Sequence, residues 1–228
     1  MSKRLTKEQL ESDPLADSYE KVQYFYQQNK AAVIGGIIAF LLIVGGGVGY
    51  YFYHQSQERQ AANLMTNAET AFLQGNYQVA LTGSEAQFTV GFEQIINNYG
   101  GTDAGNLARY YAAVCHFNMG NYQQALSNIQ RFEVPEGIMG VSPLSFHAVI
   151  LTELGNHSEA ADIYVRAAEW EVNSSTTPYN YMEAAHAYRD AGNTEQARRY
   201  AQMIIDEYPE SSQVAQAERF LGMLAADG

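Results

Sequence analysis

The residue types that most often carry out chemistry, cysteine and histidine, are sparse in this sequence. It has one cysteine, Cys115, and five histidines, and no H-E-x-x-H pattern occurs. Cys115 directly precedes His116, which would pair a thiol nucleophile with a base. Adjacent residues of a helix, however, point about 100° apart and do not face one another. We therefore predict a buried structural Cys115, and a single cysteine also excludes a disulfide framework and a multi-cysteine metal site.

A glycine-rich segment, Gly45–Gly49, superficially resembles a phosphate-binding loop. It lacks the Lys-Ser/Thr ending of such a loop and lies inside an uncharged apolar stretch. The formal net charge of −12 argues against nucleic acid as the main partner, because phosphate binding draws on Lys and Arg. We expect a protein that is not an enzyme, with no cofactor, no metal ion and no nucleic-acid partner.

The charges are unevenly distributed along the chain. Residues 1–30 hold five bases and five acids, so the whole net charge of −12 lies beyond Lys30. No lysine occurs after Lys30, and every later base is an arginine. The acid excess is compatible with a solvated surface, a high-salt host or an extracytoplasmic setting. The two compositions suggest that the two parts of the chain lie in different compartments.

An apolar segment, 31–53, separates these two parts and holds 23 residues without a charge. As a helix it would be roughly 34 Å long, slightly more than a hydrocarbon core of about 30 Å. Its six glycines weaken a helix in water but are common in lipid. A buried core helix and a cleaved signal peptide are the alternatives. The apolar residues on every face argue against the first, and the length and the preceding charged segment argue against the second. We predict an uncleaved signal anchor.

The basic residues near the segment predict its orientation. Lys21 and Lys30 lie in the twenty residues before it, and only Arg59 lies in the twenty after it. We therefore predict a single-pass membrane protein whose N-terminus is cytoplasmic. Its parts would be a cytoplasmic segment (1–30), a transmembrane signal anchor (31–53) and an extracytoplasmic domain (54–228).

Small residues recur every four positions within the apolar segment. They are Ala31, Gly35 and Ala39, and then Gly45 and Gly49. Such spacing lets two membrane helices approach closely, so a homodimer through this face is one interpretation. Random glycine richness is the other.

Beyond the apolar segment, the pattern G-N-x-x-x-A occurs four times. The copies begin at Gly75, Gly120, Gly155 and Gly192, at spacings of 45, 35 and 37 residues. Each copy predicts the turn of a helical hairpin: the glycine ends one helix in the left-handed conformation, and the asparagine caps the next. Three of the asparagines have Glu or Gln three residues later, the spacing of a capping box. The alanine is expected where two helices approach closely.

The helix before Gly120 shows residues at helical spacing that predict one buried face. They are Leu107, Tyr110, Tyr111, Val114, Cys115 and Asn118. In the first repeat an insertion, 82–87, interrupts the second helix, which we expect to resume near Phe88. The last helix, predicted over 212–225, resembles the alanine-rich helix predicted over 104–118, so it would be a terminal cap.

The period and the two Gly-Asn-Tyr-x-x-Ala-Leu segments resemble the tetratricopeptide repeat. The resemblance implies an all-α fold: a right-handed α-α superhelix of about four helical hairpins over 58–210 with a C-terminal capping helix, preceded by one transmembrane helix. The tryptophan of the family consensus is absent. Its equivalent positions hold Leu64, Arg109, Leu144 and Tyr181. The implied function is that of a non-catalytic scaffold for protein–protein interaction.

The layout as a whole resembles a narrower group, the YfgM-like ancillary subunits of the bacterial Sec translocon. The stretch 98–108 resembles what these proteins carry after their first repeat. The resemblance implies a helper of secreted-protein translocation in the bacterial inner membrane. Its partners would be translocon subunits, periplasmic chaperones or unfolded clients. The alternative is an accessory of envelope assembly or cell division, acting in peptidoglycan synthesis or an outer-membrane pathway.

In a tetratricopeptide repeat the first helix of each pair lines the concave groove, which predicts the residues that bind protein. Counting back from the Gly-Asn turns selects Tyr110, Phe117, Asn118, Val149, Tyr179, Met182, His186 and Arg189. Tyrosine and methionine suit apolar segments of varied sequence, and Arg189 can bind a carboxylate. Tyr110 and Phe117 can equally pack between repeats.

Overall fold

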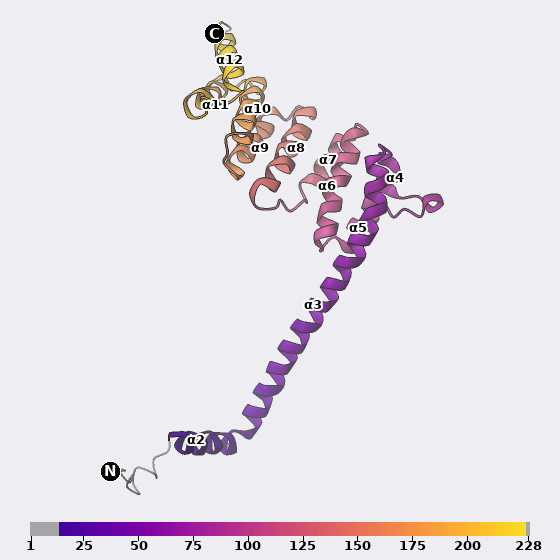
Figure 1. Ribbon diagram of the computed structural model, residues 1–228, viewed down its shortest axis with the longest axis vertical. Coiled ribbons are helices and arrows are strands. Elements are labelled where there is room, and N and C mark those ends of the chain that lie inside the picture. The colour runs from indigo at the N-terminus through magenta and orange to yellow at the C-terminus, as the bar shows by residue number, and fades with distance from the viewer. Residues whose placement is uncertain (1–13, 227–228) are drawn as a thin grey trace, which may run out of the picture. The chain divides into compact units, whose positions relative to one another are not determined.

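The computed structural model describes residues 14–226, which are helical apart from turns, loops and one isolated β-bridge. The chain divides into two compact units that meet between Ser56 and Gln57. The first unit contains α2 (Pro14–Gln28) and the start of α3 (Lys30–Leu73). Figure 1 shows the helices of the second unit following one another as a stack of hairpins.

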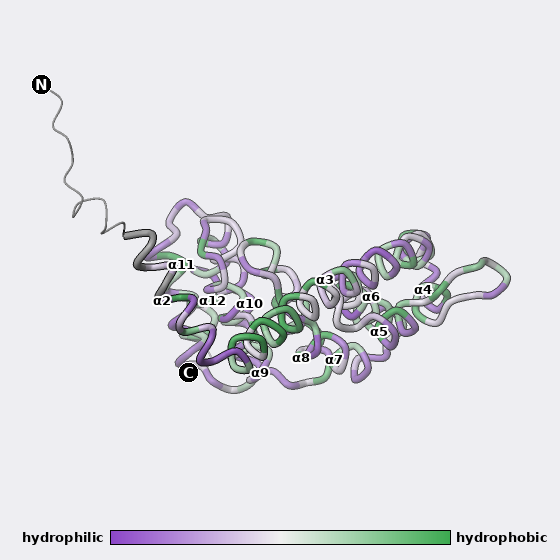
Figure 2. The backbone as a smooth tube through the Cα atoms, turned by 90° about the horizontal axis from the view of Figure 1, so that it is seen from below, coloured by the Kyte–Doolittle hydropathy of each residue, from purple (hydrophilic) through white to green (hydrophobic). Residues whose placement is uncertain are grey.

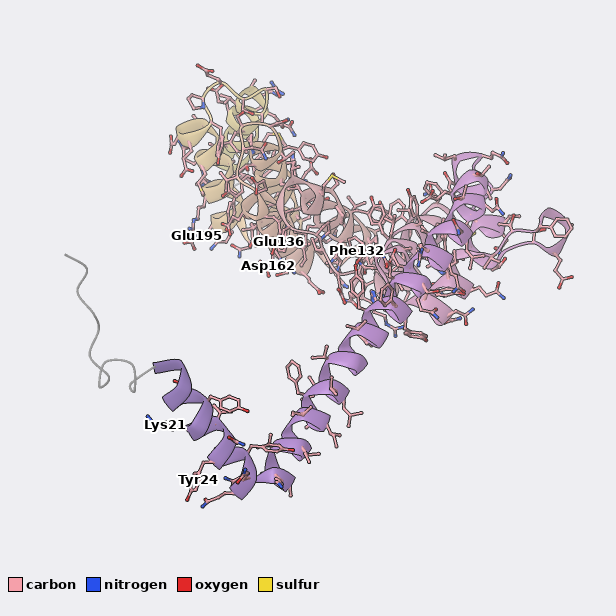
Figure 3. All side chains as sticks on the ribbon, turned by 60° about the horizontal axis from the view of Figure 1, so that its bottom comes forward. Lys21, Tyr24, Phe132, Glu136, Asp162 and Glu195 are labelled. Carbon is pink, nitrogen blue, oxygen red and sulfur yellow. The ribbon has the colours of Figure 1, made fainter. Side chains whose placement is uncertain are left out.

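The apolar part of α3 has no cover within its unit. No residue of 31–53 is buried, and Leu42 and Ile43 are 70% and 74% exposed. Its side chains project outward all around the helix (Figure 3), and its hydrophobic residues form a continuous stretch (Figure 2). The interpretation as a buried core helix is therefore wrong, and α3 is long and apolar enough to cross a membrane.

The second unit consists of helical hairpins, which confirms the predicted fold class. The end of α3 pairs with the broken helix α4–α5, and three further pairs and a final helix follow. The elements are α4 (Tyr77–Thr82), η1 (Glu85–Gln87), α5 (Phe92–Tyr99), α6 (Asp103–Asn118), α7 (Tyr122–Ile129), η2 (Gly137–Gly140), α8 (Val141–Glu153), α9 (His157–Trp170), α10 (Thr176–Asp190), α11 (Thr194–Glu207) and α12 (Val214–Ala226).

The four Gly-Asn turns share one geometry. The glycines have φ values of 76°, 76°, 76° and 77°, in the left-handed region that side chains disfavour. At the second turn Gly120 N–H donates to Phe117 O at 2.9 Å, and Asn121 N–H donates to His116 O at 2.8 Å. The same pair of bonds recurs at the other three turns. This Schellman arrangement confirms the predicted helix ends.

The predicted asparagine caps are mostly absent. Only the Asn193 side chain accepts a capping bond, from Gln196 N–H at 3.2 Å, and the other three asparagines make none. Asn121, for example, has φ −88° and ψ 59°, outside the extended region typical of a capping residue. Its backbone instead starts the next helix, because its carbonyl accepts Ala125 N–H at 3.0 Å.

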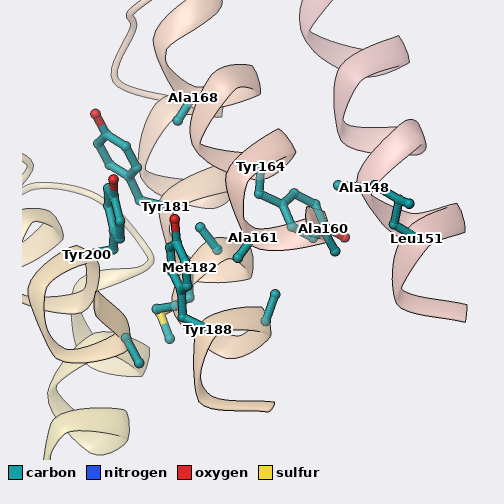
Figure 4. Packing of buried hydrophobic residues seen from close by; sticks show 14 of the residues in the cluster. Ala148, Leu151, Ala160, Ala161, Tyr164, Ala168, Tyr181, Met182, Tyr188 and Tyr200 are labelled. Atoms are coloured by element: carbon teal, nitrogen blue, oxygen red, sulfur yellow. The ribbon is translucent and has the colours of Figure 1, made fainter. Parts of the chain in front are cut away.

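Alanines form the contacts between the helices. The alanine of each repeat pattern is fully buried, as are many others in the two core clusters, the larger of which is shown in Figure 4. The predicted buried face of α6 is correct only in part: Cys115 is buried and Tyr110, Tyr111 and Val114 are half-buried, but Leu107 and Asn118 are exposed. Ala108 and Ala112, which the prediction left out, are fully buried. Small side chains occupy the buried positions because they let neighbouring helices approach closely.

The insertion in the first repeat is longer than predicted. Helix α4 ends at Thr82, and the second helix resumes at Phe92 rather than near Phe88. Between them Ser84 and Thr89 exchange two backbone hydrogen bonds of 2.9 and 3.0 Å. Phe88 has φ 51° and is 88% exposed in the loop that projects beside α4 (Figure 1).

Candidate functional site

Cys115 and His116 do not form a catalytic pair. Cys115 is fully buried in α6, and burial raises the pKa of its thiol to about 12, so it stays protonated at neutral pH. His116 points toward α5, where its Nε2 lies 3.9 Å from Glu93 Oε1. Burial lowers the pKa of His116, and the negative charge of Glu93 opposes this shift. Both residues belong to the helix contacts, as predicted for Cys115.

The predicted groove residues Tyr110 and Phe117 pack between repeats. The Tyr110 ring lies 5.6 Å from Phe132 and 5.9 Å from Phe146, and the Phe117 ring lies 5.3 Å from Phe146. Phe146 belongs to α8, so these contacts join the second hairpin to the third. Burial also raises the pKa of Tyr110, which keeps its phenol neutral. The packing interpretation is therefore the one observed for both residues.

The structure corrects the assignment of Met182. Its side chain is 0% exposed and belongs to the larger core cluster (Figure 4). Helix α10 is buried around most of its circumference, since it packs against α9 and α11, with Tyr181 and Ala185 also buried. Met182 therefore stabilises the fold and presents no surface to a partner.

His186 and Arg189 contact the C-terminal helix α12. The His186 ring lies 4.8 Å from the Phe220 ring, and its Nε2 is 3.0 Å from Gln216 Nε2. The Arg189 guanidinium lies 5.6 Å from the same Phe220 ring and donates to Asp190 Oδ1 at 2.7 and 2.9 Å. A partner carboxylate at Arg189 would therefore compete with Asp190.

The remaining predicted residues are accessible to different degrees. Tyr179 is 48% exposed, Asn118 is exposed and Val149 is half-buried. Burial and the nearby Glu183 charge raise the pKa of Tyr179, and burial raises the pKa of the half-buried Glu183 carboxyl. The first helix of the fourth pair thus combines an accessible aromatic ring with a partly desolvated carboxyl group.

A cavity in the first repeat was missed by the sequence analysis. It has a volume of about 300 Å³ and is lined by Glu58, Ala62, Met65, Glu69, Asp103, Ala104 and Leu107. We call it the first-repeat cavity. Its α3 residues recur at helical spacing, so counting back from Gly75, as at the other turns, would have found them.

A carboxylate bridges the two helices at the first-repeat cavity. Glu58 of α3 accepts the backbone N–H of Asp103 at 2.7 Å and that of Ala104 at 3.0 Å. Asp103 and Ala104 begin α6, so Glu58 satisfies N–H groups that have no partner within the helix and lies near the positive end of its dipole. The contact fixes α3 against α6 and holds one carboxylate at the cavity.

Comparison with protein families agrees with the repeat geometry. A model of the tetratricopeptide repeat-like domain matches residues 23–136, half of the chain, and a tetratricopeptide repeat model matches residues 179–211. The first match includes the apolar span and the helices from α3 to α7, and the second covers most of α10 and α11. No curated protein and no solved structure matches the chain.

Proposed function

The chain belongs to the tetratricopeptide repeat-like family, and from that premise we propose that it is a membrane-anchored, non-catalytic scaffold that binds segments of other proteins. Repeats of this family are protein–protein interaction modules, typically without catalytic activity. One observation carries the proposal: the first helices of successive hairpins keep accessible side chains, such as Asn118 and Tyr179, outside the buried alanine contacts. A stack of hairpins offers such side chains as one extended binding surface.

We propose that residues 31–53 span the bacterial inner membrane, with 1–30 in the cytoplasm and 54–228 on the extracytoplasmic side. The uncovered apolar surface of α3 supports the span, and the family match from residue 23 includes it. Lys21 and Lys30 before the span support the orientation. Protease added to spheroplasts should digest the repeats and spare an N-terminal tag. Protection of the repeats would contradict the orientation.

As partners we propose translocon subunits, periplasmic chaperones or unfolded clients, because the layout resembles the YfgM-like ancillary subunits of the Sec translocon. The small residues Ala31, Gly35 and Ala39 support a homodimer within the membrane as a second contact. Protein binding would then occur on the predicted groove residues that remain accessible: Asn118, Val149, Tyr179 and the edges of His186 and Arg189.

Site-specific crosslinking in intact cells tests this function. A photoreactive residue at Asn118 or Tyr179 should capture protein, whereas one at Glu195, exposed on the second helix α11, should capture little (Figure 3 labels Glu195). Translocon subunits or chaperones among the captured proteins would support the translocation role. Proteins of peptidoglycan synthesis or an outer-membrane pathway would point to the alternative role. Equal capture from all three positions would contradict binding by the first helices.

A further inference from the structure

The first-repeat cavity has an apolar floor. Met65 and Ala104 are 3% and 7% exposed, and the remaining apolar wall comes from Ala62 and Leu107, of which Leu107 is 40% exposed. A volume of about 300 Å³ accommodates one or two side chains of a partner, but not a folded element. The floor therefore favours an aliphatic group over a small polar ligand.

The rim of the same cavity carries three carboxylates, from Glu58, Glu69 and Asp103. Glu58 is held in place by its two bonds to the start of α6. Glu69 is half-buried, and its charge adds to the burial that raises the pKa of Tyr111 on α6, so it lies near that helix. The ion pairs His116–Glu93 and Arg189–Asp190 of the second unit involve none of these three carboxylates.

We propose that the first-repeat cavity binds a lysine or arginine side chain with adjacent apolar residues, presented by an extended segment of a partner protein. The aliphatic stem would cover Met65 and Leu107 while the cationic head meets a carboxylate of the rim. Charge complementarity selects this occupant, since an acidic segment would be repelled. The inference rests on the proposed scaffold function and names the chemistry of its ligand.

A labelled peptide of alternating lysine and leucine, twelve residues long, is the probe. Its binding to the full chain in phosphatidylcholine nanodiscs is measured by fluorescence anisotropy, with empty nanodiscs as the blank. A Glu69→Gln, Asp103→Asn double variant should raise the Kd about fivefold, because each rim charge contributes a modest screened attraction. The variant should also show a weaker dependence of Kd on salt.

The matched control is a Glu195→Gln, Glu210→Gln double variant, which removes the same charge from exposed positions on or after α11. It should bind like the parent. Leu107→Ser should weaken binding without changing the salt dependence, because it removes apolar contact only. Unchanged helical signal in circular dichroism verifies that each variant is folded.

Equal Kd values for the parent and the Glu69→Gln, Asp103→Asn variant would overturn the inference. So would a matching glutamate–leucine peptide that binds as tightly as the lysine–leucine peptide. If crosslinks from Asn118 and Tyr179 still capture protein in that case, the scaffold function stands and only the cavity assignment fails. If those positions capture nothing while the lysine–leucine peptide still requires Glu69, the groove assignment fails and the cavity stands.

Discussion

The first and fourth repeats share one turn geometry and differ in the side chains arranged before it. The turn glycines Gly75 and Gly192 have φ values of 76° and 77°. The four helical positions that precede each glycine by 13, 10, 6 and 3 residues face similar directions. They hold Ala62, Met65, Glu69 and Phe72 in the first repeat, and Tyr179, Met182, His186 and Arg189 in the fourth.

The methionine ten residues before the glycine is core in both repeats. Met65 is 3% exposed and Met182 is 0% exposed, although their neighbours differ. This position therefore serves the packing of the repeat itself. The assignment of Met182 to a binding surface is wrong because this position is buried, as Met65 also is in the first repeat.

The position six residues before the glycine depends instead on the next first helix. Glu69 is half-buried and borders the first-repeat cavity, which α6 lines with Asp103, Ala104 and Leu107. His186 is covered, because α12 contributes Phe220, which is itself only 2% exposed. The repeat thus determines the turn and the core, and the neighbouring helix decides which outer positions stay accessible.

The largest expected effect is that of a charge at the buried methionine. Met182→Glu should lower the free energy of unfolding by about 3–4 kcal/mol, because it buries a carboxylate without a partner and removes apolar packing. Tyr179→Gln, on the exposed side of the same helix, should change it by less than about 1 kcal/mol. Thermal unfolding followed by circular dichroism measures both. Equal melting temperatures would mean that α10 is not packed as described.

Loss of the Glu58 carboxylate tests the contact between α3 and the start of α6 in the first repeat. Glu58→Ala should cost about 2 kcal/mol, because two charge-assisted bonds to the start of α6 are lost. The exposed Glu195 near the start of α11 makes no comparable bridge, so Glu195→Ala should cost less than about 1 kcal/mol. Urea denaturation of the full chain compares the two. If Glu58→Ala lowered the free energy of unfolding no more than Glu195→Ala, the contact between α3 and α6 would not stabilise the first repeat.

The features predicted correctly from the sequence are those set within a few residues. A glycine in the left-handed region and an alanine at a close helix contact are local consequences of having no side chain or a small one. The same holds for the C-terminal helix, predicted over 212–225 and observed over Val214–Ala226. Cys115 was also correctly predicted as buried, since it lies among apolar residues at helical spacing.

The features missed depend on contacts between distant residues. The helix resumes at Phe92 because Gly83 and Gly91 meet closely: a Cβ on Gly91 would lie 2.3 Å from Gly83 N. No short sequence pattern predicts this close approach of the two glycine backbones. The buried face of α6 was only partly predicted, because the tight contacts there use alanines, whose small side chains stand out less in a hydrophobic pattern than Leu107. The coverage of His186 by α12 likewise follows only from the stacking of helices.

The turn glycines should respond alike in the two repeats. Gly75→Ala and Gly192→Ala should each cost about 1 kcal/mol through backbone strain, since no atom lies within 4 Å of either added Cβ. Gly222→Ala in α12 is the control, because it is helical, lacks a positive φ and has equally open space. It should stabilise by about 0.5–1 kcal/mol. Thermal melts would contradict the shared geometry if only one turn variant were destabilised.

The smallest expected effect is a pH dependence of the fourth repeat. Burial lowers the pKa of His186, Arg189 lowers it further, and Asp190 opposes both. The folded state therefore binds a proton at His186 less readily than the unfolded chain, whose histidine pKa is about 6.5. Stability is complete above that value and falls as the pH drops through it toward the lower folded pKa, by less than about 1 kcal/mol at this site.

His116 and His147 have pKa values lowered by burial as well, so they add to the same loss. His186→Asn should therefore remove only the part of this stability loss that His186 causes. The melting temperature of the variant should fall less between pH 7 and pH 5.5 than that of the parent. Glu69→Gln, at the equivalent position of the first repeat, changes no histidine and should leave this fall in melting temperature as in the parent. If His186→Asn showed the same fall in melting temperature as the parent, protonation of His186 would not weaken the contact between α10 and α12.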